Sequence, residues 1–374
     1  MNLPTDYYAG DAIRLRFKSN PKIEARLLLT NAFSTSVVEP KVLDSVFEFE
    51  IPKNYREIAG ICQWQLISQQ RVSLSGQLQI YPNTRQKSEI ESYLGPRSIT
   101  AGNIDFSMYV TVPTDVHDNP LTKGTKLLVK HQFENGLALD SVEIKNLIAW
   151  SKISATERSG RILVSSSMAG ATSQEFTAMV YPTKATDFTI AFSRNHPFAD
   201  GNQTIVFKTS TLKDLYGNIL SDGTLVNFRV RDAMGMLLLT TGISLNGIAE
   251  AKLLHPTHRE NWKVTAYIAG AAKSNELAIT FEAAVTDFDI KWDQNTRYLS
   301  VGPVKSFMDQ MIPDGLPVQL EVYNASGQFI ETMMTNSNRG FGHFTLPPDF
   351  FEAGKYQLKI EAAGITKSID VNLK

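Results

Sequence analysis

The chain has almost no cysteine and little histidine. Cys62 is the one cysteine in 374 residues, so no disulfide can form within the chain. This shortage does not decide between a cytoplasmic and an extracytoplasmic location, because β domains of this size can fold without bridges. The six histidines are scattered, and no HExxH pattern, phosphate-binding loop or nucleophile elbow is present. The sequence therefore predicts no catalytic residues, no enzyme activity and no cofactor.

Charge of one sign and long apolar runs are also missing. The 37 basic and 38 acidic residues leave a net charge of −1, unlike the basic balance of nucleic-acid-binding proteins. The longest apolar stretch, around GMLLLTTGI, is far shorter than the roughly 18 residues that a membrane helix needs. The start, MNLPTDYYAGD, lacks a basic region followed by an apolar run. We expect no nucleic-acid partner, no membrane insertion, and either assembly in the cytoplasm or an export signal that was removed.

Alternation of apolar and polar residues is the strongest local pattern. It recurs in AIRLRFK, VFEFEI, GTLVNFRV and PVQLEVY. In the third of these, Val226, Phe228 and Val230 alternate with Asn227 and Arg229, as in a strand that is buried on one face. Turn signals such as FENG, SDG, PDG and NASG separate the segments. The pattern predicts an all-β protein of sandwich domains.

The first alternating segment carries cations on its polar face. Arg14, Arg16 and Lys18 allow two interpretations, an anion-binding surface or a solvated strand face. The second is favoured, because Glu48 and Glu50 lie on another predicted strand and can pair with the cations across the sheet.

One segment departs from alternation. TRQKSEIESYLGP, residues 84–96, has Ser88 and Glu91 at the spacing of a helix-capping box, and Gly95 and Pro96 follow as stop signals. We predict a short linker helix there, between the first domain and the rest of the chain.

Internal repeats divide the remainder into related units. DVHDNPLTKGTKLLVKHQFENG, from Asp115, aligns without a gap with DLYGNILSDGTLVNFRVRDAMG, from Asp214. A degenerate third copy, MIPDGLPVQLEVYNASG, keeps the spacing between its glycines. The predicted organisation is an N-terminal β-sandwich domain (1–83), the linker helix (84–96) and three immunoglobulin-like domains (97–183, 184–283 and 284–374).

The unit 184–283 resembles the bacterial immunoglobulin-like domains of the invasin and intimin type. The resemblance rests on ADG, a strand, Asp-x-x-Gly-Asn, a turn with Gly-Thr, an alternating strand, Asn-Gly-x-Ala and a closing hairpin. The unit 97–183 has Asp118 where this pattern has glycine, and the last unit lacks Asp-x-x-Gly-Asn altogether. The resemblance implies tandem two-sheet sandwiches that extend or display, without catalytic residues.

The first domain resembles small β domains of phage and prophage structural proteins. The motifs are short: AGDAIRLRF, EFEIP, AGICQWQL and SGQLQIYPN. With the missing signal peptide and anchor, they predict a non-enzymatic component of a phage virion or tail-like particle. A bacterial cell-surface or periplasmic adhesin fragment and an array of carbohydrate-binding modules are the alternatives. The expected partners are other structural proteins of the assembly, a second copy of the chain, or a glycan or protein of a host surface.

Few residues are candidates for a site. HPTH places His255 and His258 at HxxH spacing, but beside a proline and without further ligands, which predicts a solvated loop. Cys62 shares its side of an alternating strand with Trp64, which predicts core packing.

Acidic residues and tryptophans leave two interpretations each. Asp287, Asp289 and Asp293 are weak calcium candidates at a domain boundary, where oxygen ligands from a neighbouring loop would be required; the alternative is a polar boundary. Trp150, Trp262 and Trp292 are candidates for sugar stacking or for packing in a core or between domains. The closing strand that contains Trp262 favours the core for that residue.

Overall fold

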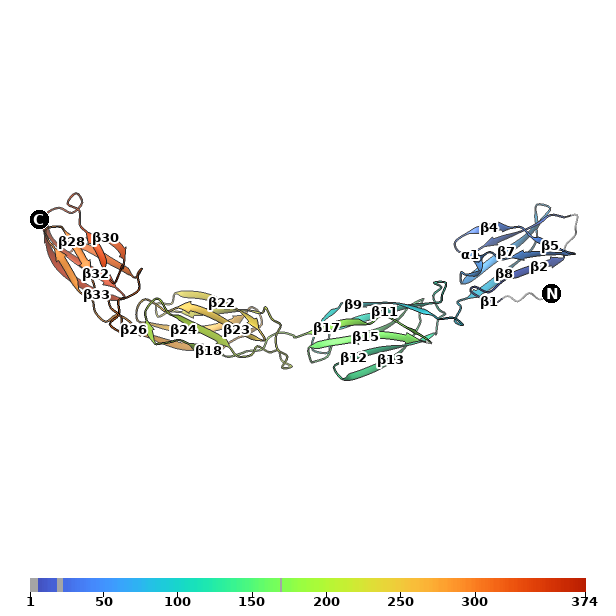
Figure 1. The fold of residues 1–374 in the computed structure, drawn as a ribbon, viewed down its shortest axis with the longest axis horizontal. Coiled ribbons are helices and arrows are strands. Elements are labelled where there is room, and N and C mark those ends of the chain that lie inside the picture. Colours follow the sequence, from blue (N-terminus) through green and yellow to red (C-terminus); the bar gives the residue numbers. More distant parts are fainter. Residues whose placement is uncertain (1–5, 19–22, 169) are drawn as a thin grey trace. The chain divides into compact units, whose positions relative to one another are not determined.

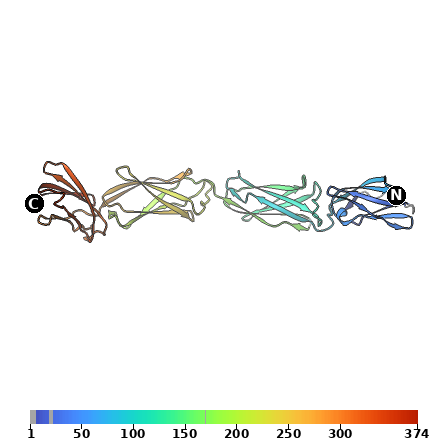
Figure 2. The ribbon, with the colours of Figure 1, turned by 90° about the horizontal axis from the view of Figure 1, so that it is seen from above.

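The computed structural model describes residues 6–18, 23–168 and 170–374, almost all of them in strands and turns (Figure 1). The chain forms two compact units, Met1–Tyr181 and Pro182–Lys374. Each unit contains two domains in which strands form two layers around an apolar core (Figure 2). Within the described residues, no helix has the length and apolar character needed to cross a membrane.

The first domain packs a five-stranded sheet, β1-β8-β7-β3-β4, against a three-stranded sheet, β2-β6-β5. A one-turn helix, α1 (Lys53–Arg56), follows β6. The strands are β1 (Asp6–Tyr8), β2 (Arg14–Lys18), β3 (Ala25–Thr30), β4 (Thr35–Val38), β5 (Lys41–Leu43), β6 (Val46–Glu50), β7 (Gly60–Ser68) and β8 (Arg71–Tyr81).

The predicted ladder of opposite charges is present in this domain. Arg14 lies opposite Glu50 and Arg16 opposite Glu48 in the β2–β6 pair. The guanidinium of Arg16 contacts the Glu48 carboxylate at 2.7 Å. The cations therefore cover a strand face with their partners, as the second interpretation predicted.

The second domain packs β10-β17-β15-β12-β13 against β14-β11-β9. Its strands are β9 (Glu89–Gly95), β10 (Ser98–Thr100), β11 (Phe106–Thr114), β12 (Lys126–Phe133), β13 (Gly136–Glu143), β14 (Ala149–Ser154), β15 (Gly160–Met168), β16 (Ala171–Thr172) and β17 (Phe176–Tyr181).

The predicted linker helix over 84–96 is wrong. Residues Glu89–Gly95 form β9, which pairs with β11 and belongs to the second domain. The segment also alternates, since Leu94 is buried in the core while Tyr93 is exposed. Ladder hydrogen bonds to β11 and burial of the Leu94 side chain outweigh the local capping signal, in which Ser88 is itself buried.

The third domain has strands β18 (Ile190–Ser193), β19 (Phe198–Ala199), β20 (Thr204–Thr209), β21 (Leu225–Arg231), β22 (Leu237–Leu245), β23 (Ile248–Leu254), β24 (Glu260–Ile268), β25 (Ala272–Lys273) and β26 (Leu277–Ala283). Strand β22 connects the two layers, because most of it pairs with β21 and its last two residues pair with β23. As predicted, Val226, Phe228 and Val230 are fully buried.

The fourth domain packs β27-β28-β31 against β30-β29-β32-β33. Its strands are β27 (Ile290–Asp293), β28 (Tyr298–Val301), β29 (Pro317–Asn324), β30 (Phe329–Asn336), β31 (Gly342–Thr345), β32 (Gly354–Ala362) and β33 (Ile365–Leu373). The paired sheets confirm the predicted fold class, tandem β-sandwich domains.

Candidate functional site

The repeated Asp-x-x-Gly-Asn stretch forms a loop around one buried carboxylate. Asp214 is only 3% exposed. One of its carboxylate oxygens accepts hydrogen bonds from the backbone N–H groups of Tyr216 and Asn218, each at 2.9 Å. The other accepts the Asn218 side-chain amide at 2.9 Å and the backbone N–H of Thr183 at 3.0 Å. Thr183 lies in the segment that leads into the third domain, so the loop holds the entering chain.

The first copy has the same arrangement. The carboxylate of Asp115 accepts the backbone N–H groups of His117 at 2.8 Å and Asn119 at 3.0 Å. It also accepts the backbone N–H of Asn83 at 2.7 Å, in the segment that leads into the second domain. We call the loops 115–119 and 214–218 the junction loops.

Hydrogen bonding controls the charge of both carboxylates. Burial alone would raise the pKa of Asp214, but the bonds from Asn218, Thr183 and Tyr216 outweigh it and lower the pKa. Burial would likewise raise the pKa of Asp115, but hydrogen bonds from Asn83, Asn119 and His117 outweigh it and lower the pKa. Both carboxylates are therefore ionised and structural at neutral pH, as expected for turn residues.

The first junction loop also contacts the preceding domain. The Asn119 side chain donates to the backbone carbonyl of Glu57 and accepts the backbone N–H of Ala59, both at 2.8 Å. The motif therefore joins the first two domains as well as shaping a turn.

The fourth domain keeps the loop without the signature. Ser306 N–H donates to the Gln310 carbonyl, and Asp309 N–H donates to the Ser306 carbonyl, as the equivalent groups do in the two junction loops. Asp309 has φ +57°, where Gly217 has +84° and Asp118 +62°. Ser306 replaces the aspartate, so no carboxylate holds the entering chain.

This fourth-domain loop reaches the third domain through an aromatic side chain. Phe307 stacks on Phe198 with ring centroids 3.7 Å apart and an interplanar angle of 17°. It also meets the ring of His196 at 5.3 Å. Sequence comparison missed this copy of the loop because all three key residues changed, although the conserved spacing to Gly315 would have located it.

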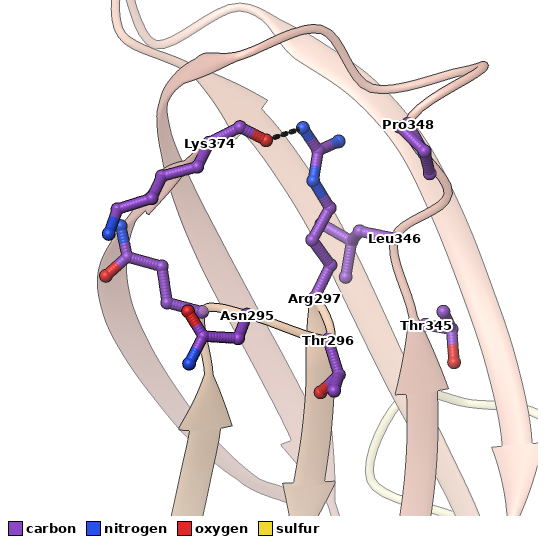
Figure 3. Close-up of a pocket in the computed structure, with 8 residues that line it drawn as sticks. Asn295, Thr296, Arg297, Thr345, Leu346, Pro348 and Lys374 are labelled. Carbon is purple, nitrogen blue, oxygen red and sulfur yellow. Dashed lines mark hydrogen bonds between the residues drawn. The ribbon is translucent and has the colours of Figure 1, made fainter.

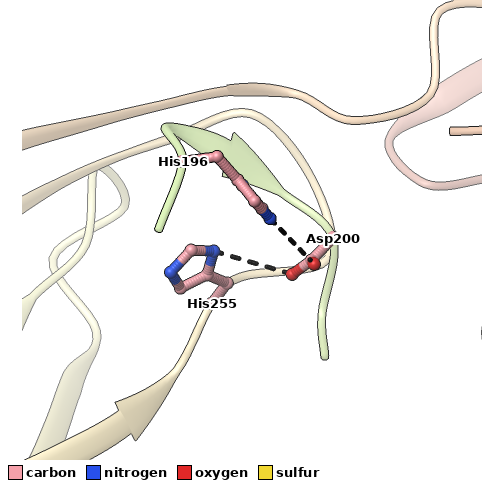
Figure 4. Close-up of side chains that lie close together, drawn as sticks. All are labelled: His196, Asp200 and His255. Atoms are coloured by element: carbon pink, nitrogen blue, oxygen red, sulfur yellow. Dashed lines mark ion pairs between the residues drawn. The ribbon is translucent and has the colours of Figure 1, made fainter. Parts of the chain in front are cut away.

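Two histidines and an aspartate form a cluster next to this contact, and one of them, His196, is the ring that Phe307 meets (Figure 4). Of the residues that the structure describes, only His196, Asp200 and His255 form a group of three that could hold a metal ion. The carboxylate lies 3.4 Å from Nε2 of His196 and 3.6 Å from Nδ1 of His255. Those separations are longer than ordinary hydrogen bonds and are compatible with ligands of one ion.

The hydrogen bonds of the two imidazoles oppose a metal. Nδ1 of His196 accepts the Phe198 N–H at 3.2 Å, so its proton belongs on Nε2. Nδ1 of His255 lies 2.9 Å from the Phe198 carbonyl, so it carries the proton. A metal beside Asp200 would need the opposite proton position on each ring. The geometry fits two imidazoles held by the Phe198 backbone better than two ligands of an ion.

His255 is not in a solvated loop, and that prediction is wrong for this residue. Its side chain is fully buried, its Nε2 has no hydrogen-bond partner among the described residues, and its ring packs 4.9 Å from Phe281. Burial lowers its pKa below the ordinary 6.5. The second histidine of HPTH, His258, is half exposed and lies 3.4 Å from the Glu260 carboxylate.

The three calcium candidates have separate partners. Asp287 pairs with the Lys367 ammonium, which lowers the pKa of the carboxyl. Asp293 accepts the Thr296 hydroxyl at 2.8 Å and the Asn295 N–H at 2.9 Å. The backbone carbonyl of Asp289 accepts a hydrogen bond from the Gly302 N–H. The structure does not bring the three carboxylates together, and the polar domain boundary stays a prediction.

The cysteine and the tryptophans differ in burial. Cys62 is buried in the first core, as predicted, and burial raises its pKa to about 11. Trp262 is buried in the third core, as the alternating pattern favoured, and Trp292 is half-buried. Trp150 is 53% exposed, so the core interpretation is wrong for it. A sequence signal existed, since Ala149 and Ile153 lie on one side of AWSKIS and Trp150 lies on the other.

One cavity lies near the C-terminal residue (Figure 3). It has a volume of about 420 Å³ and is bordered by Arg297, Thr345 and Lys374, among others. The Arg297 guanidinium donates to the backbone carbonyls of Phe351 and Lys374. Its charge is therefore used to fasten the end of β33, and the cavity presents no acid–base pair.

The chain was compared with known proteins. No protein-family model and no curated protein matches it. Several solved structures do. The Escherichia coli adhesin FdeC is 15% identical, with 77% of this chain and 96% of that chain covered and a TM-score of 0.38. InvD of Yersinia pseudotuberculosis is 15% identical, with 76% of this chain and 96% of InvD covered and a TM-score of 0.39. Invasin, a bacterial integrin-binding protein, is 11% identical, with 98% of this chain and 76% of the invasin chain covered and a TM-score of 0.45.

Of these three proteins, FdeC is an adhesin and invasin an integrin-binding protein of bacteria. None of the three named is a virion protein, so the prediction of a phage component gains no support from them.

Proposed function

We propose that the chain is a non-enzymatic protein of a bacterial cell surface, in which β-sandwich domains carry and space an adhesive surface. The observation that carries this proposal is the repeated loop. In the second and third domains a buried aspartate binds the entering backbone, and in the fourth domain Phe307 replaces that bond with a contact to the domain before it. Such loops suit domains added in series to display a surface.

The residues with chemical potential support a structural role. The junction-loop carboxylates, Cys62 and the buried histidines are used in turns, cores and a domain contact, as described above. The proposal assigns this chain to the broad class of the adhesins FdeC and invasin; the integrin that invasin binds is not assigned to it.

Labelling of intact cells tests the proposal. Antibodies raised against the purified chain are expected to label the outer surface of bacteria that encode it, by immunogold electron microscopy. Surface display of the chain on a non-adherent bacterium is expected to increase attachment to cultured host cells. Label confined to phage-like particles, or display without added attachment, would contradict the proposal.

A further inference from the structure

One face of the second domain carries exposed aromatic side chains. In the sheet β14-β11-β9, Val110 lies directly opposite Trp150 on one side and Tyr93 on the other. Residues directly opposite each other in a sheet share a face. Trp150 is 53% exposed and Tyr93 55% exposed, and Val110 between them is half-buried. The three side chains therefore form a row on the outer surface, about 10 Å wide from two strand spacings.

The residue at the equivalent strand position differs in the other two repeats. A tight hairpin turn precedes the strand in each copy, closed by the pairs Lys145–Ile148, Leu245–Ile248 and Asn338–Phe341. Two residues after each turn, Trp150 occupies the position of Glu250 in the third domain and of His343 in the fourth. In the third domain Glu250 lies opposite Lys208, a polar pair, and in the fourth His343 stacks on Tyr298 with ring centroids 5.3 Å apart. Among the three repeats, a tryptophan stands at this position in the second domain alone.

The turn itself departs from the other copies in the same domain. Its second central residue is Leu147, where the others have Gly247 and Gly340. Leu147 has φ +73° and is 61% exposed. A branched side chain is strained in this region, and an exposed one does not recover the cost by burial. Strained backbone kept in this way is found at binding sites.

A cavity of about 500 Å³ adjoins Trp150 at the edge of the sandwich, where β13 approaches β14. Besides the indole and Val142, polar side chains line it: Lys126, Ser141, Glu143 and Lys145. Lys126 and Glu143 are exposed and 3.9 Å apart, a loose pair with hydrogen-bonding capacity to spare. The cavity therefore offers donors and acceptors beside an aromatic plane.

This chemistry fits a sugar better than other ligands. A pyranose presents C–H groups on its face, which pack on an aromatic ring, and hydroxyls at its edge, which both donate and accept hydrogen bonds. An apolar anchor of a protein partner would leave the polar lining without partners. The lining carries two lysines and one glutamate, so it can both donate hydrogen bonds to sugar hydroxyls and accept them.

We propose that the second domain has a carbohydrate-binding site, in which an oligosaccharide stacks on Trp150 and hydrogen-bonds to Ser141, Glu143 and Lys145. Tyr93 extends the aromatic row for further sugar units. The inference deepens the proposed function by naming the class of partner, and it rests on that function only for its biological setting.

Binding of the purified full chain to a printed array of neutral and sialylated oligosaccharides tests the site. The wild-type chain is expected to bind glycans of the array, and Trp150→Ala to lower the apparent affinity for the strongest of them at least tenfold. Trp150→Tyr is expected to restore part of the binding. The matched control is Phe329→Ala, an aromatic residue of the fourth domain that is 55% exposed; it should bind as the wild type does.

A fluorescence measurement gives a second readout. Because Trp150 is the one tryptophan with a largely exposed ring among the four, all of which the structure describes, acrylamide quenching reports mainly on it. The strongest oligosaccharide of the array is expected to protect the wild type from quenching. Wild-type chain that binds no glycan of the array, or Trp150→Ala that binds equally well, overturns the proposal.

The two proposals fail differently. Surface labelling and attachment without Trp150-dependent glycan binding would remove the glycan site and leave the cell-surface function. Trp150-dependent glycan binding, with antibody label confined to phage-like particles, would leave the glycan site and remove the cell-surface function.

Discussion

A carboxylate inside a folded domain is stable only if hydrogen-bond donors replace water. Asp115 and Asp214 meet this condition with backbone N–H groups and one asparagine each. The consensus sequence of the loop thus reflects local geometry and not catalysis. It also explains why the motif could be interpreted from sequence as a turn, while its bond to the entering chain could not: Asn83 and Thr183 lie more than thirty residues away.

Replacement of Asp214 by alanine should destabilise the third domain by about 1–3 kcal/mol, because buried N–H groups lose their acceptor. The midpoint of urea or thermal unfolding measures the change. Glu276→Ala, an exposed carboxylate of the same domain, is the control and should leave the midpoint nearly unchanged. Since hydrogen bonds lower the Asp214 pKa, its contribution is complete above the ordinary value of 3.8 and is lost as pH falls through the lowered pKa. Equal effects of the two substitutions would contradict the assigned role.

His255 should make the third domain less stable in mild acid. Burial lowers its pKa in the folded state, so the unfolded chain takes up the proton first and stability falls as pH drops below about 6.5. The decline ends below the lowered pKa. Unfolding midpoints between pH 8 and pH 5 measure the effect, and His255→Gln should reduce it because glutamine keeps a donor for the Phe198 carbonyl without titrating. His343→Gln, in the fourth domain, should leave the pH dependence of the third domain intact; a wild-type profile that His255→Gln does not alter would refute this account.

At the scale of elements, the three related hairpin turns differ in how much strain they carry. Gly247 and Gly340 adopt positive φ without a side-chain penalty, while Leu147 does not. A substitution that removes the strain of this surface turn should therefore raise the stability of the second domain, since no burial of the Leu147 side chain is lost.

Leu147→Gly should stabilise the second domain by about 1 kcal/mol, since it removes the steric penalty of positive φ. Leu147→Asn should act in the same direction, because asparagine tolerates this conformation. Differential scanning calorimetry of the full chain measures both. As a control, Leu137→Asn alters an exposed leucine of β13, outside any such turn, and should not stabilise. A loss of stability in Leu147→Gly would mean that the side chain makes a contact worth more than the strain.

Most elements could be predicted from period-two alternation, because burial of one sheet face leaves a direct imprint on the sequence. The exception, β9, has both a capping spacing and alternation, and pairing with β11 decided between them. The burial of His255 left no such imprint, since it depends on Phe198 and Asp200 from another part of the chain. The Trp150 surface was partly predictable from its strand, but the cavity beside it needs residues of β12 and β13.

At the scale of the molecule, the domains within a unit are coupled by a few contacts. In the second unit the rings of Phe307 and Phe198 supply one of them, with His196 at the edge. This coupling is separable from the stability of either domain, because Phe307 belongs to a loop and not to a core.

Phe307→Ala should weaken the coupling of the third and fourth domains by about 1–2 kcal/mol, the contribution of a stacked aromatic pair with its buried area. Hydrogen exchange of the full chain should increase in residues 194–203 and 304–311 and remain unchanged in the two cores. Met308→Ala is the matched control, since Met308 is a neighbour in the same loop and 61% exposed. Equal exchange in both variants and the wild type would show that the ring contact does not couple the domains.

The hydrogen bond between each junction loop and the entering chain has an evolutionary consequence. Asp115 and Asp214 bind a main-chain N–H, and the residues that supply it are different, Asn83 in one case and Thr183 in the other. The bond to the aspartate itself requires only a main-chain N–H, so proline, which has none, cannot supply it. A duplicated gene segment would bring a working connector with it, whichever module came before. Lineages could lengthen or reorder such a chain without first evolving a new joint.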